Sequence, residues 1–289
     1  WIGLVLLAII TTMPELITGV SAAVLVQLPD LALGTLFGSC LFNLTILAVL
    51  DVLHRHTPIL SEVSLSHTIS VGTGIVLVAF AGGSILAGES FSGLTLGWVG
   101  IPSIIIGILY LVGARQIFRF EQKQPSASAQ SESLNYKEIS ARTVYLRFAS
   151  MAIAVIGAGI CLSFIGDEIA KTTGWNASFV GSLFLAITTS MPELTVTIAA
   201  IRLGAPDMAV ADILGANMLD ILAITWIDLF YAQGSFLTAV SKVHIITAIV
   251  VIVMSLLVVI GVVFRQRRKT FIVASWYGPL LVGLYVFGA

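Results

Sequence analysis

The sequence is poor in charge, cysteine and histidine, and each shortage excludes a class of protein. Only 10% of the 289 residues are Asp, Glu, Lys or Arg, whereas soluble globular domains carry about 25% charged residues. A chain that is 58% hydrophobic, with a mean hydropathy of +1.05, cannot cover itself with a polar surface. Water is therefore not its main solvent, and an ordinary soluble enzyme is excluded.

The low content of basic residues and cysteine also limits which partners and cofactors the protein is expected to bind. Lys and Arg number 14 against 15 Asp and Glu, so there is no basic excess to hold a nucleic acid, and none is expected as a partner. Cys40 and Cys161 both lie in apolar runs, which argues against a disulfide framework and a thiolate metal cluster. No H-E-x-x-H motif or nucleophile–base constellation is present, so we expect no enzyme and no cofactor.

All four histidines lie near the ends of apolar segments: His54, His56, His67 and His244. We expect them to be solvated at the membrane interface rather than to bind a metal.

Apolar stretches long enough to cross a bilayer, which takes about 20 helical residues, follow one another along the whole chain. Because strand-like alternation is absent, we predict an all-α, polytopic membrane protein. Nine membrane segments are expected: 1–26, 29–53, 67–88, 93–117, 143–166, 175–202, 206–232, 241–264 and 270–288.

A polar stretch from Arg119 to Arg142, rich in Gln and Ser, divides the chain. We predict two halves, 1–117 and 143–289, joined by a loop over 118–142. When the loops are assigned alternately to the two sides, twelve of the 14 Lys and Arg fall on the side of this loop. The positive-inside rule then places the loop in the cytoplasm, and we expect a cell membrane, plasma or inner.

The two halves contain a repeated motif. TTMPEL at residues 11–16 matches TSMPEL at 189–194, and Pro-Asp at 29–30 matches Pro-Asp at 206–207. The first copy is predicted to run outward through the membrane and the second inward, so the repeats are inverted. Inverted repeats with interrupted helices are the plan of many secondary transporters.

Each motif places a carboxylate beside a helix-breaking proline. Pro14 and Pro192 lack an N–H and crowd the preceding turn, so each helix is expected to bend and free carbonyl oxygens. Glu15 and Glu193 follow the prolines directly, with hydroxyl side chains three and four residues earlier on the same helical face. Because a carboxylate at the bilayer centre costs about 2.5–3.5 kcal/mol, we expect bound cations to compensate.

The expected donors are oxygens, which favour the hard ion Ca²⁺ over Mg²⁺, zinc or copper. Asp220 adds a third acid at the motif of the second repeat. Asp51 and Asp228 occupy equivalent positions in the two repeats, and two interpretations stay open for them, ion access or solvated helix ends. Asp212 has no acidic counterpart and is a weaker candidate for the pathway.

These motifs resemble those of the cation/calcium exchanger superfamily, and within it the sodium/calcium exchanger branch. The family's two inverted repeats carry Thr-Ser-x-Pro-Glu followed by Gly-Ser-Asn-x-x-Asn/Asp. Here the repeats read TTMPE with GSCLFN, and TSMPE with GANMLD. The resemblance covers essentially the whole chain and implies ten membrane helices, of which the first is missing here. It also implies exchange of Ca²⁺ for Na⁺ by alternating access.

The resemblance implies ion ligands from both repeats: Glu15, Thr11, Thr12, Ser39 and Asn43, with Glu193, Thr189, Ser190 and Asp220, and the backbone carbonyls of Ala8 and Ala186. Four positions depart from the family pattern. Ala216 replaces a Ser, Cys40 replaces an Asn, and Ile10 and Thr188 each replace the small Gly that commonly precedes the Thr. The coupling ion therefore stays open among Na⁺, H⁺ and K⁺, with a cation channel as the alternative mechanism. The expected partners are inorganic cations and the lipid bilayer, and the sequence does not identify protein partners.

Overall fold

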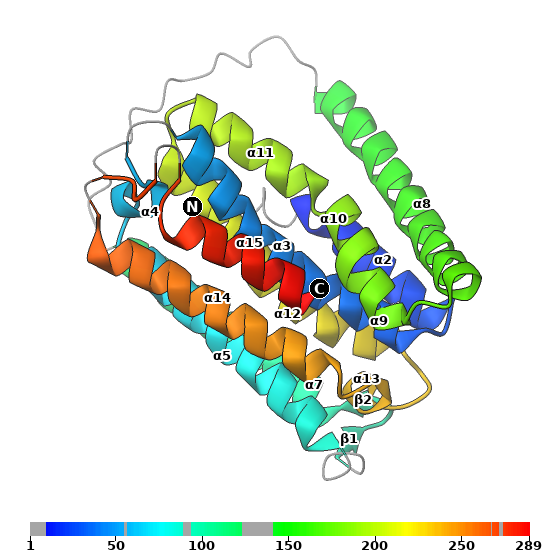
Figure 1. Cartoon of the computed structure of the whole chain (residues 1–289). Coiled ribbons are helices and arrows are strands. Elements are labelled where there is room, and N and C mark those ends of the chain that lie inside the picture. The colour runs from blue at the N-terminus through cyan, green and yellow to red at the C-terminus, as the bar shows by residue number, and fades with distance from the viewer. Residues whose placement is uncertain (1–9, 55–56, 89–93, 123–140, 267, 272–273) are drawn as a thin grey trace.

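The computed structural model describes residues 10–54, 57–88, 94–122, 141–266, 268–271 and 274–289, which are helical apart from one short hairpin (Figure 1). The elements are α2 (Met13–Val24), α3 (Pro29–Leu53), α4 (Ile59–Glu62), α5 (His67–Leu86), β1 (Thr95–Leu96), β2 (Val99–Gly100), α7 (Ile101–Glu121), α8 (Ala141–Thr173), α9 (Ala177–Val180), the π-helix η1 (Gly181–Leu185), α10 (Ala186–Thr189), α11 (Met191–Arg202), α12 (Pro206–Phe230), α13 (Phe236–Ala239), α14 (His244–Phe264) and α15 (Tyr277–Gly288).

Six helices of the described chain are long and apolar enough to span a membrane, namely α3, α5, α7, α8, α12 and α14. The stretch from α9 to α11 is a seventh candidate, bent by 43° between Thr189 and Met191. α2 and α15 are apolar but only 12 residues long. The predicted all-α membrane fold is confirmed. The predicted count of nine spans is not, although each predicted segment overlaps one of these helices.

The bundle is built around α3 and α12. In α3, 78% of the most apolar stretch is buried, and in α12 61%, against 17% in α8. A helix that is apolar on every side suits a position inside a bundle. In Figure 1, α5, α7 and α14 lie on one side of the central pair and α8 forms the opposite edge. The GSCLFN and GANMLD motifs, which lie on α3 and α12, are therefore at the centre of the protein.

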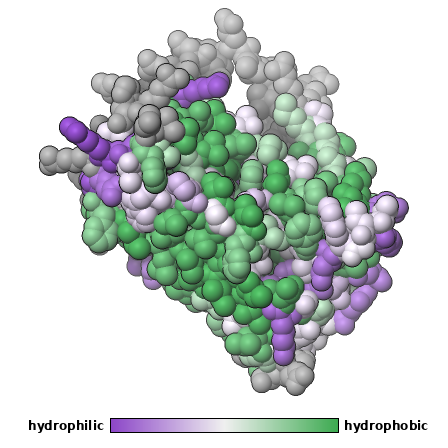
Figure 2. Space-filling model, in the orientation of Figure 1, coloured by the Kyte–Doolittle hydropathy of each residue, from purple (hydrophilic) through white to green (hydrophobic). Residues whose placement is uncertain are grey.

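The outer helices expose apolar side chains, as lipid contact requires. Ile246, Val253 and Val263 on α14 are 53%, 40% and 53% exposed. Figure 2 shows a continuous apolar area over the middle of this face, with hydrophilic residues gathered toward its margins. An apolar area of this extent would be a liability in water and fits a bilayer.

Glycines let the broken helix of the second repeat pack closely on α3. A Cβ atom at Gly34 would lie 2.6 Å from the carbonyl oxygen of Ser178, and one at Gly181 would lie 2.5 Å from that of Leu31. Such close backbone approach is a regular device of membrane helix packing. It fixes η1, a π-helical segment that leads into the break, against the centre of the bundle.

Two mirrored clusters join the repeats at their ends. Each consists of an Asp at a helix start, a serine backbone N–H and a histidine from the other repeat: Asp30 with Ser241 and His244, and Asp207 with Ser64 and His67. Corresponding members are 177 positions apart, so the clusters exchange partners between repeats. His67 and His244 are only 5% and 1% exposed. The expected solvation of these two histidines is wrong, because each ring is buried against a carboxylate.

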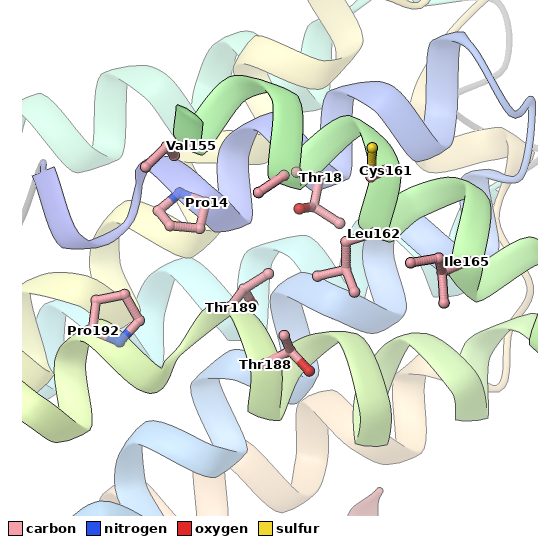
Figure 3. A pocket seen from close by; sticks show the side chains of 11 residues that line it. Pro14, Thr18, Val155, Cys161, Leu162, Ile165, Thr188, Thr189 and Pro192 are labelled. Carbon is pink, nitrogen blue, oxygen red and sulfur yellow. The ribbon is translucent and has the colours of Figure 1, made fainter. Parts of the chain in front are cut away.

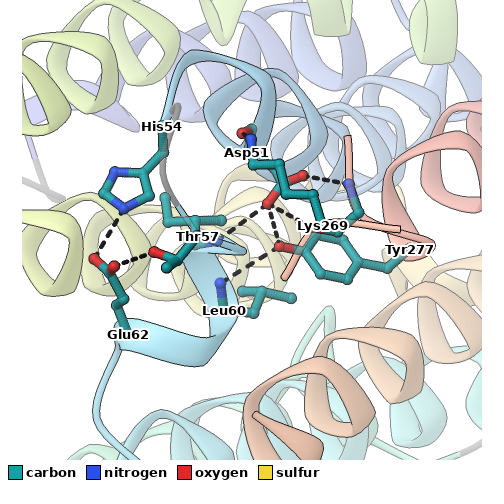
Figure 4. Close-up of polar contacts among 9 residues, drawn as sticks. Asp51, His54, Thr57, Leu60, Glu62, Lys269 and Tyr277 are labelled. Carbon is teal, nitrogen blue, oxygen red and sulfur yellow. Dashed lines mark hydrogen bonds and ion pairs between the residues drawn. The ribbon is translucent and has the colours of Figure 1, made fainter. Parts of the chain in front are cut away.

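Asp51, at the end of α3, is fully buried in a polar cluster (Figure 4). Its carboxylate accepts hydrogen bonds from Ile59 N (3.0 Å), Tyr277 Oη (2.5 Å) and both Ser275 N (2.7 Å) and Ser275 Oγ (2.9 Å). Lys269 donates to the Asp51 backbone carbonyl. This acid therefore holds the starts of α4 and α15 against α3.

Asp228 plays the same part at the end of α12. It is fully buried and accepts from Phe236 N (2.5 Å) and Gly100 N (2.7 Å). The interpretation of Asp51 and Asp228 as solvated helix ends is therefore wrong, whereas a role in ion access stays a prediction. Sequence alone could not show this, because Gly100, Ser275 and Tyr277 reach these acids only in the folded chain.

Replacing either carboxylate should destabilise the protein. Asp51→Ala and Asp228→Ala each leave buried donors unsatisfied, at a cost of about 1–3 kcal/mol for each group. We expect the Tm in detergent to fall by about 5 °C or more, measured by tryptophan fluorescence on heating. Glu168→Ala, which removes an exposed carboxylate from α8, is the matched control and should leave the Tm unchanged. Equal Tm values for all three variants would contradict this role.

Candidate cation site

Both repeats break at the residue before the Met-Pro-Glu sequence. Thr12 forms a turn ahead of α2, and Ser190 forms a turn between α10 and α11. Pro14 and Pro192 follow as the second residue of their helices, where a missing N–H costs nothing. The bend predicted for the second repeat is present, at 43°. The breaks turn the start of α2 and the start of α11 toward the interior.

Glu15 lies at the first break and faces the second repeat. Its side chain is 1% exposed, and Ser190 Oγ donates to its Oε1 at 2.9 Å. The other carboxylate oxygen, Oε2, has no hydrogen-bond partner. The predicted ligands Glu15 and Ser190, 175 positions apart, are therefore brought together.

Glu193 occupies the mirrored position at the second break. It is fully buried, and neither carboxylate oxygen has a hydrogen-bond partner of standard geometry. Thr11 of the first repeat interacts with this side chain, as Ser190 does with Glu15. Each glutamate thus faces a hydroxyl residue of the opposite repeat, which is the arrangement that inverted repeats produce.

The remaining predicted side-chain ligands lie where α3 crosses the second repeat. Asn43 Nδ2 donates to Asp220 Oδ2 at 3.4 Å, and both residues are buried. Ser39 Oγ lies 3.5 Å from Thr189 Oγ1. Asp220 Oδ1 and Asn43 Oδ1 have no hydrogen-bond partner. The site therefore contains several buried oxygens without a donor.

The backbone ligands implied by the family are only partly described. The carbonyl oxygen of Ala186 accepts hydrogen bonds from Ser190 N (3.0 Å) and from Thr189 Oγ1 (3.3 Å). In this conformation the carbonyl is therefore engaged in local hydrogen bonds of its own helix. Ala8 lies outside the described residues. Thr12 is 4% exposed, and its carbonyl accepts from Leu16 N at 3.2 Å.

The three acids act on one another electrostatically. Glu15 and Asp220 both repel negative charge on Glu193, and Glu15 repels charge on Asp220. The ion pairs of the described residues involve none of these acids. An ionised carboxylate without a cation costs several kcal/mol in such surroundings. The three acids therefore form a cluster of buried, mutually repelling carboxyl groups that has no ion pair among the described residues.

The geometry also limits the kind of ion. Among the described residues, no three His, Cys, Asp or Glu side chains meet closely enough to hold a metal ion by themselves. The polar atoms gathered here are carboxylate, hydroxyl and amide oxygens. Oxygen donors of these kinds suit hard cations better than soft ones.

A pocket of about 400 Å³ lies beside the two breaks, between α8 and the start of both broken helices (Figure 3). Its lining is Pro14, Thr18, Val155, Ala158, Gly159, Cys161, Leu162, Ile165, Thr188, Thr189 and Pro192. Thr189 belongs to this lining and also contacts Ser39. The pocket therefore reaches the predicted ligands.

Two further polar residues are buried on α12. Asp212 is 1% exposed, and both of its carboxylate oxygens lack a hydrogen-bond partner. Asn217 is 8% exposed and donates to the backbone carbonyl of Cys40 at 3.4 Å. Sequence reasoning did not include Asn217, although its place in GANMLD, equivalent to Cys40 in GSCLFN, is the signal that could have found it.

The chain matches the family described as "Sodium/calcium exchanger protein" over residues 1–115 and 143–288, which are the two predicted repeats. It is 28% identical to the inner membrane protein YrbG of Escherichia coli over 81% of this chain and 70% of that protein. It is 27% identical to the membrane protein MJ0091 of Methanocaldococcus jannaschii over 99% and 84%. A sodium/calcium exchanger, MaX1 of Methanosarcina acetivorans, is 30% identical over 50% of this chain and 39% of its own length.

The fold also matches solved structures. In one, the sodium-calcium exchanger NCX_Mj soaked with 10 mM Na⁺ and 10 mM Sr²⁺, the match has a TM-score of 0.60 at 20% identity, over 99% of this chain and 84% of that one. At this identity the match establishes the fold alone. The family consists of exchangers rather than enzymes, and because its profile covers both repeats, the chain belongs to the sodium/calcium exchanger protein family.

Proposed function

We propose that this protein exchanges Ca²⁺ for Na⁺ across a membrane at the site between the two repeats. The observation that carries the proposal is the mirrored pair Glu15 and Glu193, each buried at a helix break and facing a hydroxyl of the other repeat. Two carboxylates balance one Ca²⁺, and the neutral oxygens of Thr11, Thr189 and Ser190 complete a hard-ion shell.

Alternating access follows from the repeat architecture. A site on the pseudo-symmetry axis opens to one side or the other when one group of helices slides against the rest. We propose the halves 1–117 and 143–289 as the two repeats, a cytoplasmic loop over 118–142, and a plasma or inner membrane location. The inverted repeat favours a carrier over a channel, because a channel needs no paired half-sites.

We propose Na⁺ as the coupling ion. H⁺ or K⁺ is the alternative, because Ala216 supplies no hydroxyl where the family pattern has Ser. Asp212 lies one helical turn before Ala216, so a proton carried on this side of α12 would also be consistent with the site.

Removing either glutamate charge should abolish transport. Glu15→Gln and Glu193→Gln keep the volume of the side chain but remove the charge that balances Ca²⁺. We expect Ca²⁺ uptake into proteoliposomes, driven by an outward Na⁺ gradient, to fall to the rate of protein-free liposomes.

Glu168→Gln, at the exposed end of α8, should retain full uptake and serves as the matched control. Size-exclusion chromatography verifies that all three variants are folded. Normal uptake by both site variants would remove the proposed site.

Exchange should carry current. If three Na⁺ replace one Ca²⁺ while Asp220 stays protonated, each cycle moves one net charge across the membrane. We expect the rate of Ca²⁺ uptake to change with a membrane potential that is imposed by K⁺ and valinomycin. A potential of 100 mV changes the free energy of moving one elementary charge across the membrane by about 2.3 kcal/mol. Uptake that is independent of the potential would show that the exchange is electroneutral.

Restoring the missing hydroxyl should strengthen Na⁺ binding. Ala216→Ser adds one oxygen ligand, worth about 1 kcal/mol, so the Na⁺ concentration for half-maximal exchange should fall about fivefold. Ala209→Ser places the same hydroxyl two turns away on the same helix and should not change this concentration. If the two variants behave alike, Ala216 does not line the Na⁺ site.

A further inference from the structure

Cys40 and Asn217 face each other where α3 crosses α12. They are equivalent residues of the two repeats, 177 positions apart. Cys40 Sγ lies 3.7 Å from the Asn217 carbonyl oxygen, and Asn217 Nδ2 lies 3.4 Å from the Cys40 carbonyl oxygen. The contact is reciprocal and therefore lies on the pseudo-two-fold axis, at the centre of the bundle.

The Cys40 sulfur also contacts an acid of the site. Sγ lies 3.8 Å from Asp220 Oδ2, the oxygen that accepts from Asn43 Nδ2. Cys40 and Asp220 are both fully buried. A buried cysteine usually packs as a small apolar side chain, but this one faces a carboxylate.

Asp220, which contacts the sulfur, and the two asparagines that contact Asp220 or Cys40 each have a side-chain oxygen that lacks a partner. Asp220 Oδ1, Asn43 Oδ1 and Asn217 Oδ1 are all buried without a hydrogen-bond partner. Native proteins rarely leave such atoms unsatisfied unless a water or an ion binds them. The cluster thus offers one thiol, one carboxylate and two amide oxygens to the same small region.

We propose that Cys40 and Asp220 form a subsite for thiophilic divalent cations, of which Cd²⁺ is the probe, inside the exchange pathway. The proposal rests on the proposed function, because the exchange pathway is what brings cations to this depth. Thiolate ligands select soft cations, whereas carboxylate and carbonyl oxygens select Ca²⁺. Cys40 would therefore extend the range of divalent cations that this exchanger accepts.

The binding step is balanced by the release of one proton. The S–H bond of Cys40 breaks, an S–Cd bond forms, and the proton leaves to the solvent. Asp220 supplies the second negative ligand. No third Asp, Glu, His or Cys of the described residues joins them, so the remaining ligands are the amide oxygens of Asn43 and Asn217, either of which reaches the ion by rotation of its side chain.

Cys161 provides a control within the same chain. It lies on α8, is exposed, and lines the pocket beside the breaks. A Cys161→Ser background leaves Cys40 as the single thiol of the protein. Any cadmium–thiolate signal in that background comes from Cys40.

The experiment titrates purified protein with Cd²⁺ and records the ultraviolet charge-transfer absorption of the Cd–S bond, which requires no transport. In the Cys161→Ser background we expect the band to saturate at one Cd²⁺ per protein, with release of one proton. Cys40→Ser and Cys40→Asn, the latter copying the second repeat, should abolish the band. Cd²⁺ affinity, taken relative to the Ca²⁺ affinity of the same variant, should drop about tenfold or more.

A band that is absent in the Cys161→Ser background, or a Cd²⁺/Ca²⁺ affinity ratio that both Cys40 variants leave unchanged, overturns the proposal. Size-exclusion profiles establish that each variant is folded, and Cys40→Asn keeps the test open if Cys40→Ser misfolds. If the Cd–S band is present but Glu15→Gln still takes up Ca²⁺, the proposed exchange site fails while the thiol subsite stands. If the band is absent but Glu15→Gln is inactive, the reverse holds.

Discussion

The structure depends on burying two glutamates that have no ion pair among the described residues. Glu15 and Glu193 are 1% and 0% exposed, and three of their four carboxylate oxygens have no hydrogen-bond partner of standard geometry. In a low-dielectric interior this arrangement is costly. The break before each proline, the facing hydroxyls and the crossing of α3 with α12 hold these oxygens at the centre, and we propose that a bound cation offsets the cost.

Because the repeats are inverted, the same short motif can build both sides of this arrangement. One motif, used twice in opposite orientations, supplies both halves of a site and both ends of its scaffold. The Asp–Ser–His clusters exchange partners between repeats, and Asp51 and Asp228 hold equivalent loops at the ends of α3 and α12. Asp51 and Asp228 accept hydrogen bonds from several donors, whereas Glu193 and one oxygen of Glu15 have no partner of standard geometry. This difference in hydrogen bonding is the basis on which we propose a structural role for the first pair and ion binding for the second.

Much of the architecture could be predicted because hydropathy and repetition are local signals. The all-α membrane fold and the repeated motif were predicted from the sequence alone, whereas the set that joins Glu15 to Ser190 was implied by the family resemblance. The scaffold role of Asp51 did not follow, since its donors Ser275 and Tyr277 lie more than 220 positions away. The burial of His67 was missed for the same reason, because its partner Asp207 belongs to the other repeat. Polar contacts between residues so far apart in the chain produce no periodic pattern in the sequence.

Ion density is the most direct test of the central claim. Crystals soaked with Sr²⁺, a heavier analogue of Ca²⁺, should give an anomalous peak between the carboxylates of Glu15 and Glu193, within about 2.3–2.6 Å of oxygen ligands for the Ca²⁺-like shell. The peak should disappear when Na⁺ is in large excess. A strong peak elsewhere, for example at Asp51 or Asp228, with none between the two glutamates, would contradict the account.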